Sequence, residues 1–80
     1  MEPLPAQGLL AGTIQVLRSL GKVPVVCVYV AEDADAPLRQ KLLLACENAG
    51  VEVRPVRTMH ELGVACGIEV GAACAGVIAQ

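Results

Sequence analysis

Strand-like apolar runs mark four segments of the chain. Residues 25–30, Val-Val-Cys-Val-Tyr-Val, form a continuous and mostly β-branched run, which is typical of a strand buried on both faces of a sheet. Residues 51–56 alternate apolar and polar side chains, the pattern of a strand nearer an edge, where Pro55 loses no ladder hydrogen bond. The apolar runs 9–11 and 72–79 predict a brief first strand and a closing strand.

Helical spacing of apolar residues begins directly after the short first run. Ile14, Leu17 and Leu20 recur at this spacing and define the apolar side of a first helix. The hydroxyl of Thr13 is placed to cap the helix, because it can accept from a free N–H of the first turn. Gly21 is placed to end it.

The longest helical segment follows the central apolar run. It begins near Pro37, which suits a first turn, with Asp35 or Ala36 as the cap and Gly50 at its end. Its predicted apolar side comprises Leu38, Leu42, Ala45 and Ala49, widened by Leu43 and Cys46. A stripe of this width predicts a helix that packs on a sheet.

A capping box predicts the start of the third helix. In Thr58-Met59-His60-Glu61 the threonine hydroxyl bonds the glutamate N–H while the glutamate reaches back to the cap. This helix is predicted to run to about Cys66. Strand and helix therefore alternate up to a closing strand, and the doubly buried central run requires helices on both sides. The pattern predicts an α/β sandwich of one sheet between two helical layers.

Length and composition narrow the class of function. Eighty residues make one domain, 1–80, in which we expect residues 1–7 to be a loosely ordered start. An apolar content of 55% and a formal charge of −2 argue against intrinsic disorder. The acidic balance argues against strong nonspecific binding of polyanions such as DNA. With Tyr29 as the single aromatic residue, a base-stacking platform is not expected.

The cysteines and the start of the chain give no sign of metal or membrane chemistry. Cys27, Cys46, Cys66 and Cys74 include no C-x-x-C spacing, so we expect reduced thiols in the core and no zinc site. No basic and apolar leader opens the chain, and no uncharged apolar stretch reaches the roughly 18 residues of a membrane span. We expect a cytoplasmic protein with no cofactor and no membrane association.

Few residues offer catalytic chemistry. His60 is the one histidine, and it lies inside the capping box where it is expected to face solvent. No catalytic constellation surrounds it, so no enzyme is predicted. The acidic residues 32–35 follow the buried strand, where α/β sheets commonly place ligands. They suit either a cation site or a solvated turn that caps the next helix.

Glycines recur every fourth residue near the end of the third helix. Gly63, Gly67 and Gly71 match neither the phosphate-loop nor the dinucleotide pattern. They are expected to permit tight helix packing and a turn with positive φ. Ile68 and Val70 lie between two of these glycines in a predicted loop. An apolar loop exposed to water indicates a contact surface.

The same stretch carries a resemblance to a known family. Residues 62–73 read Leu-Gly-Val-Ala-Cys-Gly-Ile-Glu-Val-Gly-Ala-Ala, and they are preceded in the right order by Gly12-Thr13-x-Gln15 and by the run Val28 to Asp35. In these residues the chain resembles bacterial members of the ribosomal L7Ae/L30e family, from about Gly8 to Ala79. The resemblance implies a three-layer α/β/α sandwich with a mixed sheet of about four strands. It implies no enzyme activity.

The resemblance also implies a partner and a set of contacts. Members of the family bind kink-turn RNA, a sharply bent duplex with tandem sheared G·A pairs and one base flipped out of the bulge. The start of the first helix would approach the G·A pairs, and a helix start offers free N–H groups and positive potential. The flipped base would lie against the acidic turn, the third helix and the apolar loop. The implied RNA-binding residues are Gly12, Thr13, Gln15, Arg18, Asp35, Met59, Ile68, Glu69 and Val70.

One position departs from the family pattern. Family members usually have a polar base reader, Asn or Lys, where this chain has Ile14. A good base contact contributes about 1–3 kcal/mol, so its absence lowers the expected RNA affinity roughly ten- to a hundredfold. The leading hypothesis is a monomeric module for structured RNA, ribosomal or other. The alternatives are a protein–protein scaffold with weakened or lost RNA binding, and an enzyme or small-molecule binder that uses the acidic residues 32–35.

Overall fold

Strands and helices alternate along the chain in the predicted order. The computed structural model describes residues 1–79. Its elements are β1 (Leu9–Ala11), α1 (Thr13–Ser19), β2 (Val25–Ala31), α2 (Ala36–Ala49), β3 (Glu52–Val56), α3 (Met59–Cys66) and β4 (Cys74–Ile78). Each element lies at or close to its predicted bounds. The spacing of apolar residues and the positions of Gly and Pro indicate the same starts and ends, so the prediction was well determined.

The four strands form one mixed sheet in the order β1-β4-β2-β3. β2 pairs in parallel with β3, while β4 runs antiparallel to both β1 and β2. The predicted edge position of β3 is therefore confirmed, with Pro55 opposite Val30 on the outermost strand. Cys27, Val28 and Val30 of the central strand β2 are buried as expected. Val26 is half exposed, because it lies at an irregularity in the pairing with β4.

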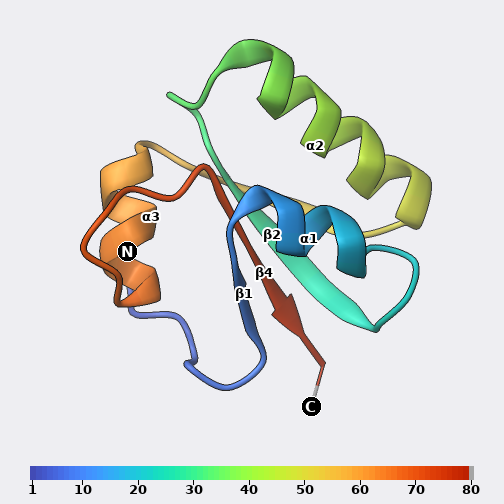
Figure 1. The fold of residues 1–80 in the computed structure, drawn as a ribbon, viewed down its shortest axis with the longest axis horizontal. Coiled ribbons are helices and arrows are strands. Elements are labelled where there is room, and N and C mark those ends of the chain that lie inside the picture. The colour runs from blue at the N-terminus through green and yellow to red at the C-terminus, as the bar shows by residue number, and fades with distance from the viewer. Residues whose placement is uncertain (80) are drawn as a thin grey trace.

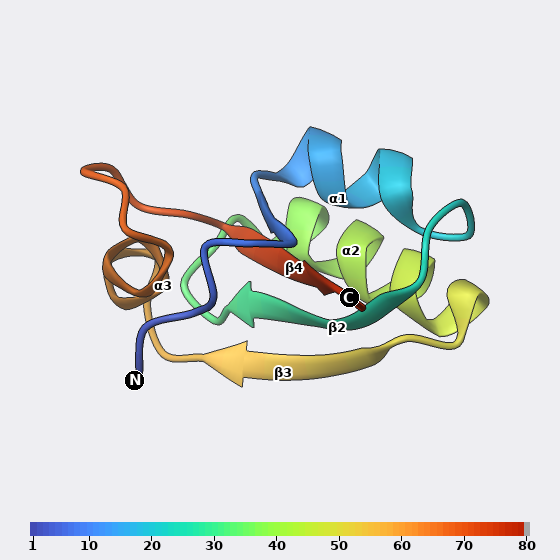
Figure 2. The same ribbon diagram turned by 90° about the horizontal axis from the view of Figure 1, so that it is seen from below.

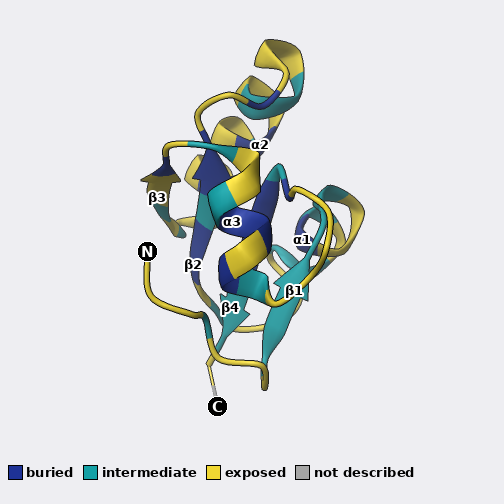
Figure 3. Cartoon of the chain, turned by 90° about the vertical axis from the view of Figure 1, so that its left-hand side faces the viewer, coloured by how far each residue is buried: buried dark blue, intermediate teal, exposed yellow. Residues whose placement is uncertain are grey.

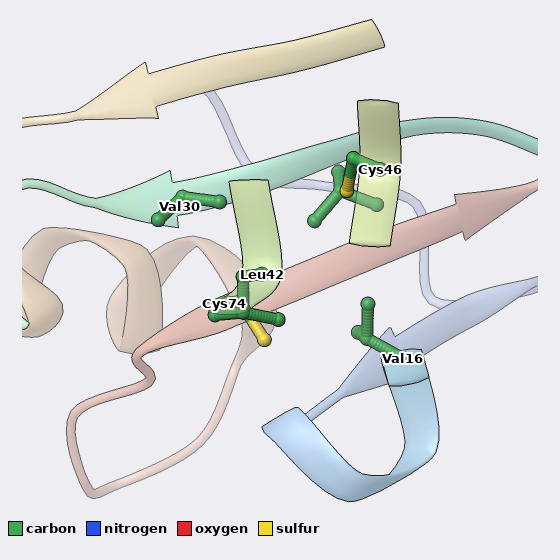
Figure 4. Packing of buried hydrophobic residues seen from close by; sticks show 6 residues of the cluster. Val16, Val30, Leu42, Cys46 and Cys74 are labelled. Carbon is green, nitrogen blue, oxygen red and sulfur yellow. The ribbon is translucent and has the colours of Figure 1, made fainter. Parts of the chain in front are cut away.

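Helices cover both faces of the sheet, which confirms the three-layer α/β/α sandwich (Figure 1). On one face, Val16 of α1 and Leu42 and Cys46 of α2 pack against β2 and β4 (Figure 4). On the other face lies α3 (Figure 3). Its Leu62 belongs to a buried cluster with residues at the ends of the strands, and Leu4 packs against this cluster. The apolar content of the chain is thus divided between two small cores.

The first helix differs from its prediction in two ways. Its N-cap is Gly12, at φ 109°, and no side chain caps it. The Thr13 hydroxyl instead accepts from the thiol of Cys74, at 3.8 Å, so the prediction of a threonine cap was wrong. The predicted apolar side was also wrong in part: Ile14 is 67% exposed, and Val16 is the buried residue of α1. A helix of seven residues buries too narrow a stripe for spacing alone to place it.

The other two helices begin and end as predicted. Asp35 is the N-cap residue of α2, and Gly50 ends this helix in the left-handed conformation. Leu43 is 41% exposed, so the predicted widening of the apolar side holds for Cys46 and not for Leu43. In α3 the Thr58 hydroxyl accepts from the N–H of Glu61 at 3.0 Å, as the capping box requires.

The cysteines are core residues with free thiols. Cys27, Cys46 and Cys74 are buried and Cys66 is partly buried. Burial raises the pKa of the thiols of Cys46, Cys66 and Cys74, so they stay protonated and unreactive at neutral pH. Within residues 1–79, no helix has the length and apolar character needed to cross a membrane.

Candidate functional site

All three helices begin at the same edge of the sheet, which we call the helix-start edge. β1, β2 and β3 end there, and α1, α2 and α3 begin after them (Figure 2). β4 runs the opposite way, so the loop 67–73 that precedes it reaches the same edge. Two backbone bonds join these parts: Gly12 N–H to Cys74 O at 3.3 Å, and Ala31 N–H to Ala73 O at 2.9 Å.

The start of α1 presents polar and apolar groups side by side. Gly12 and Thr13 are partly buried, while Ile14 and Gln15 are exposed. Ile14, 67% exposed, is thus an apolar residue at the surface of this helix start. Arg18 is exposed in the last turn of α1, farther from the helix-start edge than the other residues.

The loop 67–73 packs tightly on α3 through glycines, as the sequence predicted. A Cβ on Gly63 would collide with the carbonyl oxygen of Val70. A Cβ on Gly71 would lie 3.2 Å from the Cβ of Met59. Gly67 ends α3 with φ 77°. This packing leaves Val70 71% exposed to water and Ile68 36% exposed.

Met59, the first residue of α3, is the point where three segments meet. Its N–H donates to the Oδ1 of Asp33 at 2.7 Å. Its carbonyl accepts from the N–H of Ala72 at 3.0 Å, and its side chain, 36% exposed, borders Gly71. Hydrogen bonds to Met59 therefore connect the acidic turn 32–35 and the loop 67–73 to the start of α3.

The acidic turn is shaped by bonds to the strands and helices around it. Glu32 donates its N–H to Val56 O at 2.7 Å, and its carbonyl accepts from the guanidinium of Arg39. Asp35 is exposed, and its carboxylate makes no capping bond to α2. In residues 1–79 no cluster of three side chains suited to a metal ion occurs. The carboxylate of Asp33 bonds the first N–H of α3, in addition to the Thr58 cap, and makes no bond to α2, which the prediction of a turn capping the next helix did not anticipate.

The structure brings most of the predicted site residues to one edge. Those at the helix-start edge are Gly12, Thr13, Gln15, Asp35, Met59, Ile68, Glu69 and Val70, and Arg18 lies along α1 behind them. The sequence analysis included Asp33 among the acidic residues 32–35 but missed its bond to Met59, which spans 26 residues. No local pattern could have revealed this contact.

Three other features were not among the predicted RNA contacts. The Tyr29 hydroxyl accepts from Arg54 at 3.2 Å, and the guanidinium lies 5.8 Å from the ring centroid, so the one aromatic side chain is already engaged. Arg54 also pairs with Glu52 and lowers the pKa of that carboxyl. An open apolar pocket of about 290 Å³ between α2 and β3 is lined by Val30, Glu32, Arg39, Leu43, Val53 and Pro55. His60 is exposed, as expected.

Proteins of known sequence resemble this chain over nearly its whole length. A protein of Geobacillus thermodenitrificans named RNA-binding protein is 40% identical over 75 residues, which are 94% of this chain and 92% of that one. RNA-binding protein YbxF of Geobacillus stearothermophilus is 41% identical over the same shares.

Solved structures share the fold. The 15.5 kD RNA-binding protein of Giardia lamblia superposes with a TM-score of 0.84 at 28% identity, over 92% of this chain and 62% of that one. A protein of unknown function from Bacillus halodurans superposes with a TM-score of 0.83 at 29% identity, over 94% of this chain and 75% of that one. The model of the ribosomal protein L7Ae/L30e/S12e/Gadd45 family matches residues 4–80. The chain therefore belongs to the ribosomal protein L7Ae/L30e/S12e/Gadd45 family.

Proposed function

We propose that this protein binds structured RNA through the helix-start edge, and that its RNA is a kink-turn. The observation that carries the proposal is the gathering of eight of the predicted contact residues at this one edge, with the apolar loop 67–73 held open to water. Relatives that share about 40% of their residues with the chain are named RNA-binding proteins, which supports the RNA part of the proposal.

The start of α1 is the proposed reader of the sheared G·A pairs. Gln15 is exposed and its amide can both donate and accept at a base edge. Arg18, exposed in the last turn, offers a fork of donors to a guanine or a phosphate. Gly12 has no side chain and that of Thr13 is short, so the backbone of an RNA strand can approach them closely.

The acidic turn, Met59 and the loop 67–73 are the proposed receptor for the flipped base. Ile68 and Val70 offer apolar contact to the faces of an unstacked base. The exposed carboxylates of Asp35 and Glu69 can accept hydrogen bonds from its amino or imino groups. The fixed geometry of these segments favours one well-defined ligand over a range of single strands.

The small size and the low charge of the chain guide the rest of the proposal. We propose one domain, 1–80, that acts as a monomer in the cytoplasm, on ribosomal or other structured RNA, without enzymatic activity. Six basic residues and a charge of −2 favour a small footprint over contacts to many phosphates.

A charge placed in the apolar loop tests the proposed receptor. Val70→Asp puts a carboxylate beside the RNA at a side chain that is 71% exposed, so the fold is kept. We expect the Kd for a kink-turn RNA, measured by calorimetric titration, to rise about tenfold or more. The matched control is Val23→Asp, in the exposed connection after α1 at the opposite end of that helix, which should change Kd far less. Equal Kd values for the two variants would contradict the proposed contact.

A protein-interaction module is the second candidate. The exposed Ile14 replaces a polar reader, and it favours this reading because an apolar side chain suits a protein surface better than a base edge. Under this reading Val70→Asp would remove a protein from pull-downs while kink-turn and control RNAs bound equally weakly. An unaltered partner set would count against it.

A further inference from the structure

The bond between Asp33 and Met59 connects two sides of the proposed base receptor. Asp33 lies in the acidic turn, two residues before Asp35, and its Oδ1 accepts from the Met59 N–H at 2.7 Å. The Met59 carbonyl in turn accepts from Ala72 at 3.0 Å, and Gly71 packs against its Cβ. A chain of short contacts thus runs from the acidic turn through α3 to the apolar loop.

Other contacts hold the acidic turn to the sheet and to α2. Glu32 is bonded to the end of β3, and Ala34 N–H returns to Ala31 O at 3.2 Å within the turn. Within residues 1–79, Asp33 makes the one side-chain hydrogen bond between this turn and α3. Removing it leaves the turn attached to the sheet and to α2, where the Asp35 carbonyl accepts from the Arg39 N–H at 2.9 Å, but takes away its one side-chain bond to α3.

We propose that Asp33 is a positioning residue for RNA recognition: its carboxylate fixes the acidic turn relative to Met59 and the loop 67–73, and so sets the width of the receptor for the flipped base. This inference rests on the proposed function. Asp33 need not touch RNA, because its effect passes through the first N–H of α3. A receptor assembled from three segments loses affinity when one of them is free to move.

The sign of the effect separates positioning from charge. RNA is a polyanion, so the loss of a nearby carboxylate would by itself tighten binding. Positioning predicts the reverse for Asp33→Ala, because alanine cannot accept the Met59 N–H. Asp33→Asn keeps an acceptor oxygen without the charge, so it should bind as tightly as the natural protein or more tightly.

Titrations with two RNAs test the proposal. One is a kink-turn RNA, and the other is the same RNA with an abasic site at the flipped position. We expect Asp33→Ala to weaken binding of the first about tenfold, and of the second much less, while Asp33→Asn keeps both affinities. Asp33 is exposed, so the variants retain the buried core. Thr58→Ala is the control, because Thr58 caps the same helix within its own first turn.

The outcomes separate this inference from the function on which it rests. If Asp33→Ala binds the kink-turn as tightly as the natural protein, Asp33 has no positioning role although the proposed function stands. If Asp33→Ala and Thr58→Ala, at equal thermal stability, weaken both RNAs alike, the effect is one of helix stability and the positioning role is again overturned. If the natural protein itself fails to bind the kink-turn, the proposed function fails first.

Discussion

At the scale of single residues, Ile14 lies in a different environment from the one predicted for it. It stands at the start of α1 with 67% of its side chain exposed, although a buried stripe was predicted for it. An exposed isoleucine contributes little to stability, because its apolar surface is not buried, and it has no group that could hydrogen-bond a base edge. Its place beside Gln15 at the helix-start edge makes it the most informative position for RNA affinity.

We predict that Ile14→Lys tightens binding to a kink-turn RNA. A lysine there restores a donor to a base or phosphate, and one good base contact contributes about 1–3 kcal/mol, so Kd should fall about tenfold or more. Val23→Lys adds the same charge at the other end of α1 and should produce a smaller fall. If Ile14→Lys leaves the titrated Kd unchanged, residue 14 does not face the bases.

Single residues were also where sequence reasoning reached its limit. The capping box at Thr58 could be read locally, because its partner lies three residues away. The contacts of Thr13 with Cys74 and of Asp33 with Met59 join residues far apart in the chain. Such pairs depend on how the strands are ordered, which no local pattern contains.

At the scale of elements, α3 and the loop 67–73 form one unit. Gly63 lies inside α3, where a glycine costs about 1 kcal/mol in helix propensity, yet the loop needs it because a Cβ there would collide with Val70 O. From the spacing of the glycines, one every four residues, the sequence predicted close packing here. The approach of the Val70 carbonyl to Gly63 required the structure.

We predict that Gly63→Ala lowers the free energy of unfolding by about 1–3 kcal/mol. Helix propensity alone would make the alanine variant more stable. The new Cβ would, however, collide with the Val70 carbonyl oxygen and force the loop outward. We expect the collision to outweigh the propensity, because a backbone carbonyl cannot move without displacing the loop. Urea denaturation measures the difference. Val64→Ala, at an exposed position of the same helix, is the control and should be neutral or slightly stabilising. A Gly63→Ala protein as stable as the natural one would refute the close packing.

At the scale of the whole molecule, the order of strands places the residues of the proposed RNA site at one edge of the sheet. Because β4 runs antiparallel between β1 and β2, three helix starts and one loop meet at a single edge. The alternation of strands and helices could be predicted from the sequence. The strand order could not, since several topologies share that alternation, and the family resemblance was needed to narrow them.

The charge of the molecule agrees with such a compact site. Of the six basic residues, Arg54 is paired with Glu52 and Arg39 is bonded to Glu32, so four remain for phosphates. So small a number disfavours binding spread over many phosphates, in agreement with our proposal that the protein recognises the shape of its RNA.

The most direct test compares two RNAs that differ only in the G·A pairs. The natural protein is titrated at low salt with a kink-turn RNA and with the same RNA in which Watson–Crick pairs replace the tandem sheared pairs. We predict that the kink-turn binds at least about tenfold more tightly, because the replacement removes both the bend and the base edges that face α1. Equal affinity for the two RNAs would contradict kink-turn recognition at the helix-start edge.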